Sequence, residues 1–413
     1  MTNIRRSVLK RLARAIPPGD VPPWGIRHGL QALKFQMAEL SSYEEASCNK
    51  LAPVFPAARS EVVAPSTLTH KPKVVSRPAS PVTPILFHDV MAQSHNSLLR
   101  QGQGALVPPS HMKQPGRYRY EDNKTYTLQH GQRVFLSNFA KQHHNKAICA
   151  FGSGASNWYH WLIELLPMVM LAENLPAEFD DYPLAVPEDL LASPNFRDAL
   201  DLFVSGRTLL PLPAKMQHVF STLVVIPQPT HGPFNLSHGN WPVPEDYLQI
   251  VDVMQRFRSR ILEKLDIAVT GDTPKHIFLA RPPENRSYNQ EEIIRAAEAR
   301  GLVSIRPETL SFRDQVQLFH NADVIVGPTG AAFANSLFCR PGTTSVSWML
   351  RQYSEACAFS NIAHLTGADM SYCFVEADKP VENTDQAFFA SYKLPLEVFE
   401  AHLDTVLTDR ANS

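Results

Sequence analysis

The sequence predicts an α/β protein built from two Rossmann-like domains. Its 413 residues exceed what one ordinary hydrophobic core accommodates, which favours two domains plus extensions. Between residues 276 and 348, short apolar runs alternate with stretches of helical periodicity. This alternation is typical of a parallel sheet with right-handed crossovers.

Residues 1–84 are expected to form an N-terminal extension. Apolar residues at helical spacing between basic side chains predict a helix at 4–16, which either lies on an anionic membrane surface or forms a surface helix or frayed terminus. A second helix is expected at 30–46. Residues 53–84, rich in proline, serine and threonine, are expected to be an extended connector.

Residues 85–245 are expected to form the first domain, and 246–413 the second. A long amphipathic helix at 247–265 would bridge them. In the first domain we expect strands at 135–139, 147–151, 184–186 and 222–226, and helices at 158–173 and 196–204.

In the second domain we expect four strands separated by helices. Ligands bind beyond the carboxyl ends of parallel strands, so the loops that follow these strands are where a site is expected. The strands are predicted at 276–280, 303–306, 323–326 and 344–348, and the helices at 290–300, 312–320 and 331–338.

Composition narrows the possible functions. The 39 basic and 40 acidic side chains nearly cancel, which argues against nucleic acid as a partner. Five scattered cysteines without a Cys-x-x-Cys pair argue against a disulfide framework or a cysteine-rich zinc site and favour a reducing compartment. No run approaches the roughly 18 apolar residues that span a bilayer. We therefore expect a cytoplasmic protein, with peripheral contact at the inner membrane face through the basic N-terminus as one alternative.

A histidine and a glutamate four residues apart begin the helix at 158–173. His160 and Glu164 would project from one helix face, so the carboxylate could orient the imidazole as a general base for an acceptor hydroxyl. The alternative is an ordinary i,i+4 pair without a catalytic role. A zinc site is not expected, because the second histidine of a His-Glu-x-x-His pattern is missing.

A glycine-containing turn lies between the strand at 323–326 and the following helix. Gly327 and Gly330 permit a sharp turn that exposes backbone amides at a helix N-terminus, a natural cradle for phosphate. The alternative is a tight turn without a ligand. Thr329, Ala331 and Asn335 complete this candidate donor-binding segment.

Two arginines follow the strand at 276–280. Arg281 and Arg286 suit a diphosphate, because guanidinium groups bind phosphate oxygens bidentately. Glu308, just beyond the next strand, could reach a ribose hydroxyl. No two aspartates are separated by a single residue, so no Asp-x-Asp metal clamp is present and no metal cofactor is expected.

The acceptor is expected near Asn157 and the loop at 230–241. His231 and His238 are candidates for sugar binding and reserve candidates for the base, although this loop could equally be irregular surface structure. The turn at 152–157 begins like a dinucleotide-binding fingerprint, but Asn157 occupies its third glycine position. NAD binding is therefore disfavoured.

Three of these stretches, in this order, resemble glycosyltransferase family 61, which includes bacterial capsular-polysaccharide proteins and plant xylan-decorating enzymes. The resemblance covers roughly residues 85–350. The matching pieces are Asn157 to Trp161 with Glu164 and Pro167, the segment 281–289, and Asp323, Gly327, Gly330, Ala331, Asn335, Phe338, Pro341 and Gly342.

The resemblance implies a GT-B fold, in which two Rossmann-like domains face a central cleft. It also implies metal-independent, inverting transfer from a nucleotide-sugar donor, usually UDP-linked, to a glycan acceptor. His160 and Glu164 would act on the acceptor side, and the arginines and glycine turn on the donor side. This chain departs from the family pattern at Thr329, where a histidine is common, and at Ser347 and Trp348, where a glutamate is frequent.

Two hypotheses follow from these observations. The first is a transferase in bacterial capsular or surface-polysaccharide assembly. The second, motivated by the two departures, is a catalytically inactive relative that binds a nucleotide or glycan as an assembly subunit.

Overall fold

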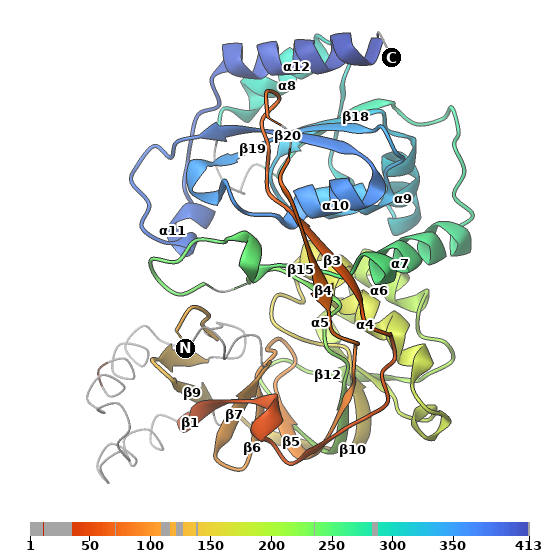
Figure 1. The fold of residues 1–413 in the computed structure, drawn as a ribbon, viewed down its shortest axis with the longest axis vertical. Helices are drawn as coiled ribbons and strands as arrows, with labels where there is room; N and C mark the ends of the chain where they lie inside the picture. Colours follow the sequence, from red (N-terminus) through yellow and green to blue (C-terminus); the bar gives the residue numbers. More distant parts are fainter. Residues whose placement is uncertain are drawn as a thin grey trace.

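The computed structural model describes residues 11, 35–70, 72–108, 116–120, 127–137, 139–234, 236–282 and 288–411. Within these residues the chain is mixed α/β, with a large sheet and a smaller parallel sheet stacked along the long axis of the molecule (Figure 1). The helix expected at 4–16 lies outside the described residues, apart from residue 11.

The large sheet is mixed rather than parallel, which corrects the expectation for residues 85–245. In the described chain it has eleven strands, of which β12-β11-β10-β13 form a parallel block and most of the others pair antiparallel. The parallel block is β10 Lys141–Cys149, β11 Leu184–Pro187, β12 Leu209–Leu212 and β13 Gln217–Val225. The rest of the sheet is β1 Phe35–Ser42, β2 Cys48–Lys50, β5 Ile85–Ala92, β6 Leu99–Gln101, β7 Gly104–Val107, β8 Leu128–His130 and β9 Arg133–Ser137.

The helix predicted at 30–46 is wrong over its described part, because residues 35–42 form β1. This strand pairs parallel with β7 and antiparallel with β9, both far away in the sequence. Its buried positions are 35, 38 and 42, and spacings of three and four residues imitate a helix face. The cross-strand partners, rather than the local pattern, therefore decide the structure.

The expected connector at 53–84 contains an antiparallel hairpin that links the two sheets. Its antiparallel strands β3 Ala58–Val63 and β4 Val74–Ala79 extend between the large sheet and the smaller one (Figure 1). The backbone N–H of Val63 donates to Asn361 Oδ1 at 2.6 Å, and Ser360 Oγ donates to the carbonyl of Val63 at 2.6 Å. The N-terminal segment is thus anchored on the C-terminal half.

The smaller sheet confirms the parallel strands predicted from residue 276 onward. In the described chain it has five parallel strands in the order β17-β16-β18-β19-β20. Its strands are β16 His276–Leu279, β17 Val303–Ile305, β18 Val324–Pro328, β19 Thr344–Leu350 and β20 Asp369–Val375. Its helices are α8 Gln290–Glu298, α9 Phe312–Asn321, α10 Ala358–Thr366, α11 Thr384–Phe388 and α12 Leu396–Ala411, with a 3-10 helix η7 at Ala331–Phe338.

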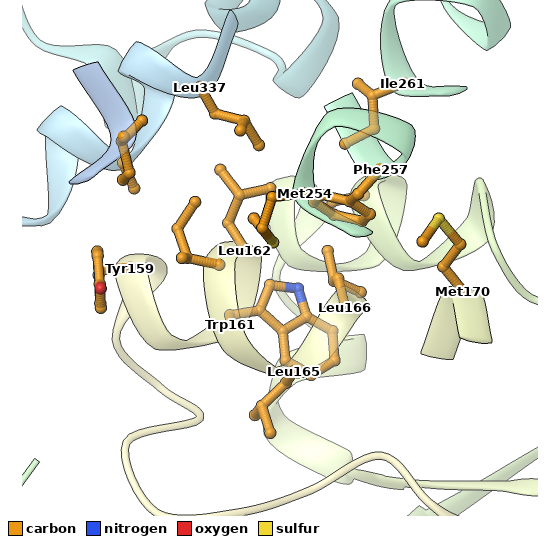
Figure 2. Packing of buried hydrophobic residues seen from close by; sticks show 14 of the residues in the cluster. Tyr159, Trp161, Leu162, Leu165, Leu166, Met170, Met254, Phe257, Ile261 and Leu337 are labelled. Atoms are coloured by element: carbon orange, nitrogen blue, oxygen red, sulfur yellow. The ribbon is translucent and has the colours of Figure 1, made fainter. Parts of the chain in front are cut away.

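One hydrophobic core joins the two sheets. Helix α4 Leu166–Leu171, preceded by a π-helix η2 at His160–Leu165, packs toward helix α7 Val251–Lys264 (Figure 2). Burying these apolar faces stabilises the relative position of the halves, because each large apolar side chain contributes roughly 1.5–3 kcal/mol. Figure 2 shows Trp161, Leu162 and Leu166 beside Met254, Phe257, Ile261 and Leu337.

Candidate active site

The carboxyl ends of β16, β17 and β18 open onto one cleft of about 560 Å³. The chain leaves β16 for β17 on one side and returns to β18 on the other, so the strand order reverses at β16. Such a reversal leaves a crevice between neighbouring loops, where α/β proteins bind ligands. Of the predicted residues, the cleft is lined by Asn157, Arg281, Glu308, Gly330, Ala331 and Asn335.

Two hydrogen bonds position Arg281, which lines this cleft. Its backbone N–H donates to Gln290 Oε1 at 2.9 Å, and its Nη2 donates to the carbonyl of Thr329. Its Nη1 is buried and has no hydrogen-bond partner among the described residues. A buried cationic N–H without an acceptor is costly, so this atom is suited to an anionic ligand. Arg286 lies outside the described residues.

The glycine turn is only partly a ligand cradle. Gly330 lines the cleft in extended backbone and precedes η7, which is a 3-10 helix where an ordinary helix was expected. Gly327 instead lies inside β18, where an added Cβ would be 2.8 Å from Leu279 Cβ. Gly327 therefore permits close packing of β18 against β16 rather than lining the cleft.

Asn335 lines the cleft and connects the two halves of the molecule. The side chain is fully buried; its Oδ1 accepts from Trp158 Nε1 at 2.9 Å, and its Nδ2 donates to Gln315 Oε1 at 2.9 Å. Both ends of the amide are occupied within the protein. Asn335 thus contributes to the site chiefly by holding Trp158 against the second sheet.

His160 and Glu164 form the pair that their spacing predicted. His160 Nδ1 lies 2.7 Å from Glu164 Oε2, and Glu164 Oε1 accepts from the backbone N–H of Gly232 at 2.7 Å. A carboxylate only accepts, so Nδ1 carries the proton and Nε2 is left as the basic nitrogen. The pair lies in a π-helical turn, a geometry frequent at functional sites.

Neighbouring residues fix the orientation of the imidazole. Tyr159 and Phe234 contact it edge-on, with centroid distances of 5.2 and 5.0 Å. Gly154 has φ +78°, and an added Cβ there would be 2.8 Å from the ring. His160 lines a second cleft of about 410 Å³, which Asn157, Arg281 and Thr329 also line.

The reserve histidines line neither the cleft of about 560 Å³ nor the cleft of about 410 Å³. His231 lines a small cavity of about 40 Å³ beside Glu164, and burial lowers its pKa, an effect that the nearby Glu164 carboxylate opposes. His238 is exposed and lines none of these cavities. The structure therefore brings His231 close to the candidate base but leaves His238 apart.

Two groups of site residues were not predicted. Gln290 positions the Arg281 backbone, although the sequence marks it only as a helix start. Phe388 and Phe389 line both large clefts, yet they follow no strand of the predicted sheet and carry no local motif. Among the described residues, no three His, Cys, Asp or Glu side chains are grouped to hold a metal ion.

The five cysteines all lie among the described residues, and no disulfide joins any two of them there. In the described part of the chain, no helix is both long and apolar enough to cross a bilayer.

Comparison with known proteins adds an independent finding. Residues 158–346 match the family model for Glycosyltransferase 61. The match begins at Trp158, beside the candidate base, and extends through the loops after β16, β17 and β18 to β19. No curated protein matches the chain. Over these residues the chain is similar to glycosyltransferase family 61, and this similarity supports the class of glycosyltransferases, enzymes that transfer a sugar from a donor to an acceptor.

Proposed function

We propose that the protein is an inverting, metal-independent glycosyltransferase that moves a sugar from a UDP-linked donor to a hydroxyl of a glycan acceptor. The proposal places residues 85–245 on the acceptor side and 246–413 on the donor side of a GT-B arrangement. It places the reaction in the cytoplasm, in bacterial capsular or surface-polysaccharide assembly, with the basic N-terminus as a peripheral membrane contact.

The observation that carries the proposal is the meeting of two clefts at Asn157 and Arg281. One cleft contains His160, and the other contains Glu308 and Gly330. A base on one side and an anion-binding group on the other suit a displacement in which the nucleophile enters opposite the leaving group. This geometry supports inversion at the anomeric carbon.

The mechanism follows from these positions. His160 Nε2 accepts the proton of the acceptor hydroxyl while its oxygen forms the new bond to the anomeric carbon. The bond between that carbon and the diphosphate oxygen breaks, and its electrons remain on the leaving nucleoside diphosphate. The Arg281 guanidinium and the N-terminus of η7 would stabilise the negative charge. Glu164 keeps the imidazole in the required tautomer and stabilises its protonated form.

A second candidate function is supported by a contact between Thr329 and Ser347, two residues at which the chain departs from the family pattern. Thr329 Oγ1 lies 2.9 Å from Ser347 Oγ, so the positions where a histidine and a glutamate are common are here joined by two hydroxyl groups. A neutral pair provides less charge stabilisation for a leaving diphosphate. Under this alternative, the protein binds a nucleotide or glycan without turnover and acts as an assembly subunit.

Calorimetric titration with UDP, GDP, CMP and NAD in the presence of EDTA tests the donor site. We expect UDP to bind and NAD not to bind. Arg281→Ala should weaken UDP binding by roughly 10- to 100-fold, because a charged hydrogen bond contributes about 1.5–3 kcal/mol. Arg351→Ala is the control, since Arg351 forms an exposed pair with Glu376. Equal UDP affinity in both variants would remove Arg281 from the donor site.

Transfer assays with a donor and acceptor panel separate the two functions. If the protein is a transferase, His160→Ala abolishes most turnover while UDP affinity is retained. UDP binding without turnover across the panel in the unmodified protein would instead support the binding subunit.

A further inference from the structure

The cleft that contains His160 has an unusual aromatic wall. Within the described residues, three phenylalanines are among the exposed large apolar residues: Phe234 at 44%, Phe388 at 44% and Phe389 at 78%. All three line this cleft. An exposed aromatic ring forgoes a substantial burial energy, so gathering these three rings at one cleft favours a ligand that covers them.

The rings are arranged around the candidate base. Phe234 contacts the imidazole of His160 edge-on, with 5.0 Å between centroids. Phe388 contacts Phe389 at 5.0 Å with the ring planes 78° apart, which supports the outer ring. Phe389 lines this cleft and also the neighbouring cleft at the strand ends, so a ligand bound beside His160 shares its wall with Phe389.

The described lining of the same cleft carries few charged side chains. Its described lining contains no aspartate, glutamate or lysine, and apart from His160 its one basic residue is Arg281, which the donor cleft shares. A carboxylate bound here would lose its hydration. It would gain no ion pair in return, because the proposed donor already occupies Arg281. Polar side chains such as Asn157, Thr329 and Thr384 provide neutral hydrogen-bonding groups.

We propose that this cleft binds an uncharged sugar acceptor, one of whose apolar ring faces stacks on Phe389. A sugar ring combines an apolar face for the aromatic wall with a hydroxyl for His160, and a simple hydrocarbon lacks the second of these. The inference rests on the proposed function and adds the acceptor class: neutral glycans are accepted, and uronic-acid rings at this position are rejected.

The test measures binding rather than turnover, so it does not depend on catalysis. Saturation-transfer NMR in the presence of UDP compares methyl glucoside, galactoside and N-acetylglucosaminide with methyl glucuronide and methyl galacturonide, using the full chain. We expect at least one neutral glycoside to bind, and the uronides to bind at least about tenfold more weakly.

Variants then assign the binding to the aromatic wall. Phe389→Ala and Phe389→Leu should weaken binding of the neutral glycoside by about tenfold or more. UDP affinity is measured in parallel, because Phe389 also lines the donor cleft, and we expect the larger loss to be in glycoside binding. Val398→Ala is the control, because Val398 is also exposed, at 46%, but lies outside both clefts. Phe389 is largely exposed, so these changes should not disturb folding.

Three results would overturn the inference: uronides that bind as well as neutral glycosides, no binding by any glycoside, or a Phe389 variant that loses UDP affinity and retains glycoside binding. Failure of the proposed function has a different signature. It would appear as absent UDP binding or absent turnover while the glycoside results stand.

Discussion

Replacing Glu164 by glutamine tests the proposed catalytic pair most directly. The buried carboxylate accepts two hydrogen bonds, one from His160 Nδ1 and one from the Gly232 N–H, each at 2.7 Å. A carboxamide has one accepting oxygen and one donating NH₂, so it cannot satisfy both donors. Either orientation of the amide therefore disrupts one contact.

The two orientations have different consequences. If the amide oxygen accepts from Gly232, the NH₂ group faces His160 Nδ1. The imidazole must then carry its proton on Nε2, and Nε2 can no longer act as the base. If the oxygen accepts from Nδ1, the NH₂ opposes the Gly232 N–H and displaces that loop. We expect a loss of roughly 10²- to 10⁴-fold in kcat, the usual contribution of general-base catalysis. The cost in stability should be about 1–3 kcal/mol.

The assay is kcat at saturating donor and acceptor, together with chemical denaturation and UDP affinity. Glu173→Gln is the matched control: Glu173 lies in the short 3-10 helix after α4, and its carboxylate accepts from Arg260 and Ser205 away from both clefts. This control should lose some stability but retain kcat. If Glu164→Gln retained kcat within about threefold, or the control lost as much activity, the catalytic assignment would be refuted.

Three further predictions use other parts of the molecule. Gly154→Ala and Gly206→Ala introduce the same backbone strain, since both residues have φ +78°. Only at position 154 would the new Cβ meet the imidazole of His160. Only Gly154→Ala should therefore lower the transfer rate, by tenfold or more. Asn335→Ala removes the acceptor of Trp158 Nε1 and should lower the free energy of unfolding by about 1–3 kcal/mol, measured by chemical denaturation. Burial lowers the pKa of His402 to about 4. In the unfolded chain the imidazole takes up its proton near pH 6.5, so the stability of the fold should be highest above pH 6.5 and fall toward pH 4. His402→Asn should reduce this pH dependence, measured by thermal denaturation at pH 7 and pH 5. Equal activity of the two alanine variants, an unchanged unfolding energy or an unchanged pH slope would contradict these three expectations in turn.

The sequence predicted the second half of the fold better than the first for a physical reason. Strands such as β16 and β18 are buried on both faces and separated by amphipathic helices, so the local pattern is sufficient. Strand β1 is different, because its partners β7 and β9 are distant in the sequence. Its buried residues are also spaced three and four apart, as on one face of a helix. Local periodicity does not reveal such partners.

The site shows the same division. Residues at strand ends or in a helical i,i+4 pair, such as Arg281 and His160, could be predicted because geometry follows from spacing. Phe389 lies in a segment after β20, and only the folded chain brings it to the cleft. The role of Gly327 depended on the nearness of Leu279, which spacing alone does not show.

The hairpin β3–β4 also affects how the protein is made. The contact between Val63 and Asn361 joins positions 298 residues apart in the sequence, so during synthesis the hairpin has no partner on the smaller sheet until most of the chain has emerged. Loops of that length close slowly, and the exposed strands are vulnerable to mispairing in the meantime. We expect the two halves to be poor candidates for separate expression and the full chain to depend on chaperones or low temperature during production.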